Sequence, residues 1–148
     1  MVYTRILAAL LSVFCLCTVP VFAATPRVEK TIETICFEDG TYLQITTTET
    51  ENMTRSSAKR VYRDYNYYVD NKLAVCYTLT GIFEYDGKTS KATDVTASAS
   101  IYQSGWSLKS HHESRSGNRI YGTATFSGPN GDKTLSGSIT CDKDGNLS

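Results

Sequence analysis

The feature that most constrains this chain is an alternating segment at residues 73–85, LAVCYTLTGIFEY. Apolar and aromatic side chains recur there at every second position, and small or polar residues fill most positions between them. A period of two is typical of a β-strand with one buried face. The polar runs 70–72 and 86–88 flank the segment, and each can reverse the chain. The segment therefore predicts a half-buried antiparallel strand whose core face holds Leu73, Val75, Tyr77, Leu79, Phe83 and Tyr85.

Similar strand patterns separated by turn residues continue along the rest of the chain from residue 27. They predict strands near 29–37, 41–48, 58–69, 89–102, 106–113, 119–126 and 133–141, with a polar loop at 49–56. About eight strands at this spacing, without a helix, indicate an all-β fold, and we expect an antiparallel β-sandwich in hairpin order. A small β-barrel is the alternative. Gly81, Gly122 and Gly137 lie inside predicted strands, where glycine marks a bulge, a bend or a close approach of another backbone.

The first 24 residues have the pattern of an export signal. Arg5 provides a positive start, residues 6–19 are an apolar run, and Val21-Phe22-Ala23 resembles a small-x-small cleavage site. A membrane anchor is the competing interpretation, but the run is shorter than the roughly 20 residues that span a bilayer, and Pro20 interrupts its end. We therefore expect a signal peptide at 1–24, a single domain at 25–148, a secreted or envelope-associated location, and no integral membrane segment after cleavage.

The charge balance argues against a polyanionic partner. The whole chain is formally neutral, and loss of Arg5 with the leader would leave about one excess negative charge. Proteins that bind nucleic acid carry a basic patch or stripe. Nucleic acid is therefore not an expected partner, and no cofactor is implied by any motif.

Export makes disulfides a consideration, and three cysteines remain after the leader. Cys141 is in phase with the apolar face of its strand, whereas Cys36 and Cys76 lie opposite the core faces of theirs. These phases predict a Cys36–Cys76 disulfide and a buried free thiol at Cys141. The alternative is three reduced cysteines that act as small hydrophobic residues.

Few residues suggest catalysis or metal binding. His111 and His112 are the two histidines, and neighbours on a strand point to opposite faces, so they are poorly placed to share a metal. A hydrolase would have to use one of them, although the sequence contains neither a HExxH nor a GxSxG motif. The segment 142–146, DKDGN, resembles the opening of a calcium loop, but no closing carboxylate follows it, and we interpret it as a polar turn.

The most suggestive surface is the segment 59–68, KRVYRDYNYY. Aromatic and basic side chains together can stack on sugar rings or anchor a protein partner. The alternative is that tyrosine is simply a good strand former and that about half of these rings turn inward. The candidate binding residues are Arg60, Tyr62, Arg63, Tyr65 and Tyr67.

Most of the chain after the leader also resembles an uncharacterised family of small secreted proteins of Gram-positive bacteria. The resemblance lies in the runs FEDGTYL at 37–43, YTLTGIFEYDG at 77–87 and IYQSGW at 101–106, the turn at 116–118 and the end at 139–148. It implies a secreted β-protein and no particular activity. Similar proteins carry a cysteine near the position of Asp94 that could pair with the one at Cys141. This chain has no cysteine there, which is consistent with an unpaired Cys141.

Together these observations favour a secreted, non-enzymatic binding module that acts at the cell envelope or another outside surface. The expected partner is a cell-wall glycan or a surface protein. Two alternatives remain open: a secreted hydrolase that uses His111 or His112, and a diffusible effector or antibacterial protein.

Overall fold

The fold is known from a computed structural model, which describes residues 27–52 and 57–148. The predicted signal peptide at 1–24 and the centre of the predicted 49–56 loop lie outside the described residues. Eight β-strands make up the described chain. They are β1 (Arg27–Cys36), β2 (Tyr42–Asn52), β3 (Ser57–Val69), β4 (Lys72–Tyr85), β5 (Ser90–Ile101), β6 (Ser107–Ser116), β7 (Arg119–Gly128) and β8 (Gly131–Thr140). Among the described residues, no helix is long and apolar enough to cross a membrane.

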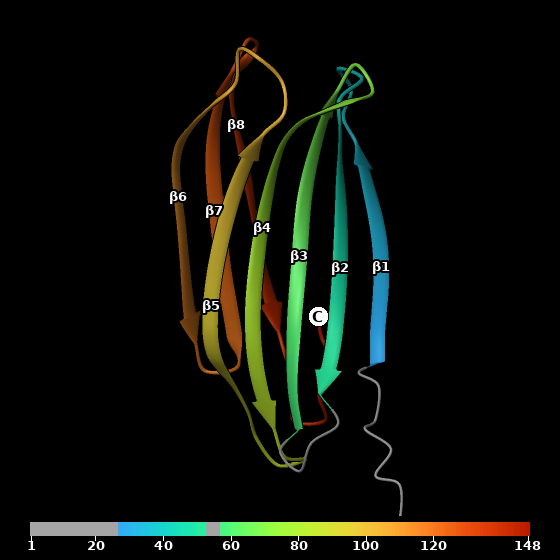
Figure 1. The fold of residues 1–148 in the computed structure, drawn as a ribbon, viewed down its shortest axis with the longest axis vertical. Helices are drawn as coiled ribbons and strands as arrows, with labels where there is room; N and C mark the ends of the chain where they lie inside the picture. The colour runs from blue at the N-terminus through green and yellow to red at the C-terminus, as the bar shows by residue number, and fades with distance from the viewer. Residues whose placement is uncertain (1–26, 53–56) are drawn as a thin grey trace, which may run out of the picture.

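The strands form two antiparallel sheets that pack as a sandwich (Figure 1). One sheet has the order β1-β2-β3-β4-β5 and the other has the order β6-β7-β8. Within each sheet, therefore, strands that are consecutive in sequence are also paired. The predicted sandwich in hairpin order is confirmed, and the sheets are not closed into a barrel. Strand β6 lies beside β5, where the chain passes from one sheet to the other.

Turn chemistry explains why the chain folds back so regularly. Asp70 and Asn71 both have positive φ angles, 49° and 58°, as a two-residue hairpin turn between β3 and β4 requires. Glycines with positive φ occur in further described reversals, including Gly117 and Gly131, which lie between the strands of the smaller sheet. These short turns fix the register of the strand pairs that they join.

The core lies between the two sheets and is formed by the predicted alternation. On β4, the inward side chains of Val75, Tyr77, Leu79 and Phe83 are fully buried. The facing strands supply Ile120, Ala124, Phe126, Leu135 and Ile139. Burial of this apolar surface is the main favourable term in the stability of the sandwich.

Three local predictions were wrong. Leu73 does not join the core cluster, because the register shifts opposite Tyr67 and Tyr68 and both Ala74 and Val75 turn inward. Ile101 alternates in phase with Val95, Ala97 and Ala99, and its position predicted an inward side chain, but at the end of β5 it is 45 % exposed. Residues 49–52, predicted to begin a loop, continue strand β2.

The five-stranded sheet extends beyond the three-stranded sheet. Strand β8 lies over β3, where Tyr65 packs against Gly137, and β7 lies over β4, where Tyr77 packs against Gly122. Strands β1 and β2 therefore project past the edge of the smaller sheet (Figure 1), and every residue of β1 is exposed.

Candidate functional site

Strand β3 separates the five predicted binding residues onto two faces. Tyr65 and Tyr67 are 2 % and 5 % exposed and belong to the core. Arg63 shares their face, because it pairs with Thr47 and Leu79 across the sheet and Leu79 is buried. Only Arg60 and Tyr62 lie on the outer face. The structure therefore does not bring the predicted set together, and alternation along the strand is the physical reason.

The three inward residues serve the fold. The Arg63 guanidinium donates from Nε to Thr47 Oγ1 (3.0 Å) and from Nη1 to the Ser138 carbonyl of β8 (2.8 Å), so it joins the two sheets. The Tyr67 hydroxyl donates to Thr41 Oγ1 (3.0 Å). The Tyr65 ring stacks on that of Tyr77, and burial raises the pKa of the Tyr65 phenol. These side chains are unavailable to a partner.

The outer face of the five-stranded sheet gathers a different aromatic set. Tyr42 of β2 and Tyr68 of β3 face each other across the sheet, and their rings stack with centroids 4.5 Å apart and an interplanar angle of 7°. Tyr62 and Arg60 of β3 lie on the same outer face. The set that we call the tyrosine face comprises Tyr42, Tyr62, Tyr68 and Arg60.

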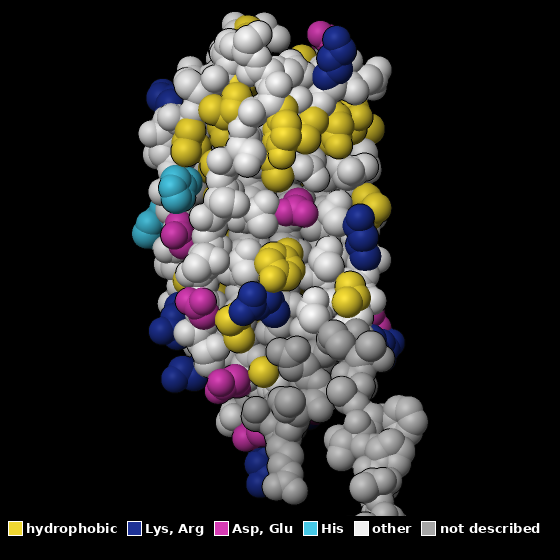
Figure 2. All heavy atoms as spheres, in the orientation of Figure 1, with side chains coloured by type: hydrophobic (Ala, Val, Ile, Leu, Met, Phe, Trp, Pro, Cys, Tyr) yellow, Lys and Arg dark blue, Asp and Glu magenta, His cyan; other side chains and the backbone are white. Residues whose placement is uncertain are grey.

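Figure 2 shows this surface as a band of hydrophobic side chains across the upper part of the sheet, with isolated charges below it. Leu73 pairs with Tyr68 and continues the same row of the sheet. The Arg60 guanidinium donates from Nη1 to the Tyr62 hydroxyl (3.3 Å). Asp64, next after Tyr62 in the outward-facing row of β3, accepts a hydrogen bond from Thr78 Oγ1 (2.6 Å). The face is therefore aromatic and hydroxyl-rich, with a few charged side chains, Arg60 and Asp64 among them.

Sequence reasoning missed Tyr42 and Tyr68 as members of this face. A usable signal was present for Tyr68, because it is six residues from Tyr62 and an even spacing places both on one side of a strand. Tyr42 comes from another strand, and only the pairing of β2 with β3 places it beside Tyr68.

The cysteines do not form the predicted Cys36–Cys76 disulfide, and all three are free thiols. Cys36 ends β1 and Cys76 lies in β4, with β2 and β3 between them. Three strand spacings amount to about 14 Å, which is twice the largest Cα separation of about 7 Å that a disulfide allows. Cys141 is completely buried. Burial raises the thiol pKa of both Cys76 and Cys141, which disfavours the reactive thiolate.

The two histidines lie on opposite faces of the smaller sheet. His111 pairs with the buried Ala124, and its Nδ1 is 3.4 Å from Glu113 Oε2. His112 pairs with Thr123 on the outer side and lines a shallow hollow of about 330 Å³ with Tyr121. The two imidazoles therefore cannot act on one substrate group. Within the described ranges, no group of three or more His, Cys, Asp or Glu residues is placed to hold a metal ion.

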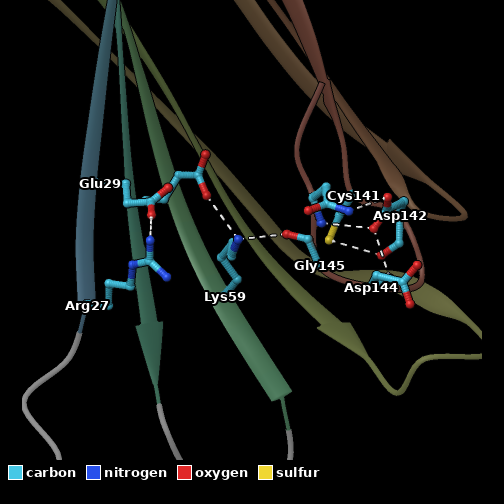
Figure 3. Close-up of polar contacts among 9 residues, drawn as sticks. Arg27, Glu29, Lys59, Cys141, Asp142, Asp144 and Gly145 are labelled. Atoms are coloured by element: carbon cyan, nitrogen blue, oxygen red, sulfur yellow. Dashed lines mark hydrogen bonds and ion pairs between the residues drawn. The ribbon is translucent and has the colours of Figure 1, made fainter.

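A charged pocket of about 330 Å³ lies between the start of β1 and the turn after β8 (Figure 3). Lys59 connects its two walls: the ammonium donates to Glu49 Oε2 (2.9 Å) and to the Gly145 carbonyl (2.7 Å). Arg27 pairs with Glu29 at the pocket's edge. These charges are already matched within the chain, which makes the pocket a connection between sheet and turn.

The turn in this pocket is the DKDGN segment. Asp142 Oδ1 accepts the backbone N–H groups of Asp144 and Asn146 (both 2.8 Å), and Oδ2 accepts from the Asn146 side chain (2.8 Å). These bonds lower the pKa of the Asp142 carboxyl. The carboxylate is thus occupied by the turn itself, as the interpretation of a polar turn predicted.

Comparisons with known proteins give no further guide to the site. No family model matches the chain, and no similar curated protein or solved structure was found.

Proposed function

We propose that this protein is a secreted, non-enzymatic binding module, held at the cell envelope or another outside surface by its tyrosine face. The observation that carries the proposal is the gathering of Tyr42, Tyr62 and Tyr68 on one open side of a five-stranded sheet. None of these rings belongs to the core cluster. The three rings are partly exposed, and aromatic side chains grouped on a surface mark interaction sites more often than scattered apolar residues do.

The chemistry of the face suits a neutral, hydroxyl-rich partner. Tyrosine rings offer apolar surface with a polar end, and rows of threonine run beside them, with Thr48, Tyr62 and Thr80 aligned across β2, β3 and β4. Charges near the rings are few, and Arg60 already donates to Tyr62. We therefore propose a cell-wall glycan as the partner class. A surface protein is the alternative, because tyrosine and arginine are also enriched at protein interfaces.

The sequence pattern of residues 1–24 and the resemblance to secreted Gram-positive proteins support the proposed location. A hydrolase gains no support from the histidines, since His111 and His112 point to opposite faces of β6. The proposal therefore rests on the tyrosine face and the export pattern.

Fractionation of a producing culture tests the proposed function. The protein would be followed by mass in the medium, the wall and the membrane fractions. We expect it in the wall fraction, released by soluble wall sugars if the partner is a glycan and by salt if charged protein contacts dominate. Free protein in the medium would indicate a diffusible effector or enzyme, and protein inside the cells would contradict export.

A further inference from the structure

Among the described residues, three of the four sheet edges hydrogen-bond at one end of the strand to another part of the chain. On β8, Thr140 exchanges two backbone hydrogen bonds with Ser148 (2.9 and 3.0 Å), and Arg63 donates to the Ser138 carbonyl. On β5, Ala92 donates its N–H to the Gly117 carbonyl and accepts from Arg115, both at 2.8 Å, so the edges of β5 and β6 are joined. Open strand edges invite pairing with other chains, and covering them is the usual protection.

Strand β1 is the exception. No backbone atom of β1 hydrogen-bonds to a described residue outside β2. The strand is ten residues long, pairs with β2 in an unbroken register and contains no proline. Val28 and Ile32 are 61 % and 59 % exposed and lie on the outer face, while Ile35 is 40 % exposed on the inner face. A long, regular edge strand with exposed apolar side chains has the properties of an association surface.

We propose that β1 pairs edge to edge with β1 of a second copy of this chain. The strands would run antiparallel about a two-fold axis perpendicular to the sheet, as closed symmetry in a dimer requires. The two five-stranded sheets would then form one continuous sheet, in which the free N–H and C=O groups of each β1 are satisfied by the other.

Charge repulsion and the length of strand that can pair together select the register of this pairing. A two-fold axis perpendicular to the sheet keeps the outer faces of both copies on the same side. Two directly opposed residues therefore lie both on the outer face or both on the inner face, so their residue numbers are both even or both odd. Registers that centre Glu29, Lys30 or Glu33 on the axis oppose two identical charges, and centring Thr31 opposes Glu29 to Glu33. Like charges directly opposite destabilise an antiparallel pair.

Centring Ile32 on the axis avoids every such clash and pairs residues 28–36, a longer stretch than the registers centred on Val28, Thr34 or Ile35 allow. Ile32 then meets Ile32 of the second copy, Val28 meets Cys36, and Lys30 meets Thr34 on the outer face. On the inner face, Glu29 meets Ile35 and Thr31 meets Glu33. The three apolar contacts at the centre and ends of the outer row use the side chains that β1 leaves exposed, and residues 28–36 of both copies are paired.

The arrangement has a consequence for any ligand of the outer surface. Because the axis is perpendicular to the sheet, the outer faces of both copies point in the same direction. A ligand with repeated units, such as a polymer, could contact the outer faces of both copies at once. The second contact is then intramolecular, which raises the apparent affinity of the dimer above that of one copy. The dimer itself does not depend on the proposed function.

Cross-linking tests the register directly. The protein would be purified from producing cells as they process it, and Ile32→Cys would be combined with Cys36→Ser to remove the nearby thiol. Opposed residues of an antiparallel pair are about 4.5–5.5 Å apart at Cα, within the range of a disulfide. We expect a disulfide-linked dimer on mild oxidation. The matched control, Ile101→Cys with Cys36→Ser, places an exposed cysteine at the far edge of the same sheet and should stay monomeric on a non-reducing gel.

A charge at the axis provides a second test. Ile32→Lys opposes two ammonium groups on the axis, and because Ile32 is exposed, the variant should fold normally by circular dichroism. We expect its dimer dissociation constant to rise about tenfold or more in sedimentation equilibrium, whereas Ile101→Lys should leave it unchanged. A native protein that is monomeric at all concentrations, a dimer that Ile32→Lys leaves intact, or equal cross-linking at residues 32 and 101 would overturn the proposal.

Discussion

The ring of Tyr65 lies directly over Gly137, so close that a Cβ atom on residue 137 would come within 2.6 Å of the ring carbon Cζ. The neighbouring strands repeat the relationship, since a Cβ on Gly122 would come within 2.8 Å of Leu79 Cδ1 and closer still to the Tyr77 hydroxyl. Tyr65 pairs with Tyr77 in one sheet, and Gly122 pairs with Gly137 in the other. A pair of rings thus occupies the space left by a pair of glycines, which fixes how the sheets stack.

This relationship predicts a specific energetic coupling. Gly137→Ala should lower the free energy of unfolding by about 1–3 kcal/mol, the usual cost of overpacking. Adding Tyr65→Phe removes the nearest obstructing atom, so the double variant should lose less than the sum of the two single variants. Urea unfolding measures both effects, with Ser136→Ala on the outer side of β8 as the control. Strict additivity would show that the ring and the glycine are not in contact.

Stability should fall in strong alkali because of buried phenols. Burial raises the pKa of Tyr77 to about 12, above the ordinary value of 10.0 that the unfolded chain restores. The contribution of the protonated Tyr77 phenol to stability is complete below pH 10 and is lost between pH 10 and about 12. Over that range, Tyr77 lowers the free energy of unfolding by up to about 1.4 kcal/mol per pH unit.

Unfolding free energies at several pH values between 9 and 12 would check this prediction. Tyr77→Phe removes the titrating group and should flatten the decline, although the variant also alters packing in the core. An equally steep decline in the variant would assign the alkaline loss to other groups.

A cation–π contact should contribute to stability at the end of the sandwich. The Lys133 ammonium lies 3.7 Å from the ring centroid of Phe37 and 4.5 Å from that of Tyr67. Lys133→Met keeps most of the aliphatic stem and removes the charge, and we expect a loss of about 1–2 kcal/mol in urea unfolding.

Lys109→Met is the matched control for that variant. Its ammonium pairs with Asp132 on the surface, and both side chains are about half exposed. Such pairs are worth little, so the change should be well under about 1 kcal/mol. Equal effects of the two substitutions would contradict a special role for the rings around Lys133.

The thiols should differ in reactivity. Cys36 is exposed, whereas Cys76 is partly buried and Cys141 fully buried, and burial raises the thiol pKa of the latter two. Iodoacetamide at neutral pH should therefore label Cys36 first in the folded protein and all three residues after unfolding in urea, as peptide mass mapping would show. Protection of both Cys36 and Cys76 until a reductant is added would instead reveal a disulfide that this fold does not allow.

Alternation and turn chemistry made most of the fold predictable. The buried face of β4 and the reversal at Asp70 and Asn71 follow from local sequence, because strand period and positive φ are local properties. The bulge that displaces Leu73 is not local, since it depends on how β3 and β4 align.

The site was less predictable because it depends on which strands are neighbours. Cys36 and Cys76 both lie on the side of the sheet that their phases indicated, yet two strands separate them. Tyr62 and Tyr65 were grouped because they are close in sequence, although odd spacing on a strand sends them to opposite faces. Tyr42 joins the tyrosine face only through its pairing with Tyr68.

Sedimentation with isolated cell walls tests whether the tyrosine face binds the wall. The triple variant Tyr42→Ala, Tyr62→Ala and Tyr68→Ala changes only the outer face of the five-stranded sheet. Tyr121→Ala is the control, because Tyr121 is 41 % exposed on the outer side of the other sheet. Both variants would first be checked for cooperative unfolding.

The fraction of protein that sediments with walls would then be compared for native protein and both variants. We expect native protein and the Tyr121 variant to sediment alike, and the triple variant to remain mostly in solution, with its affinity reduced about tenfold or more. Equal sedimentation of all three proteins would contradict the tyrosine face as the binding surface.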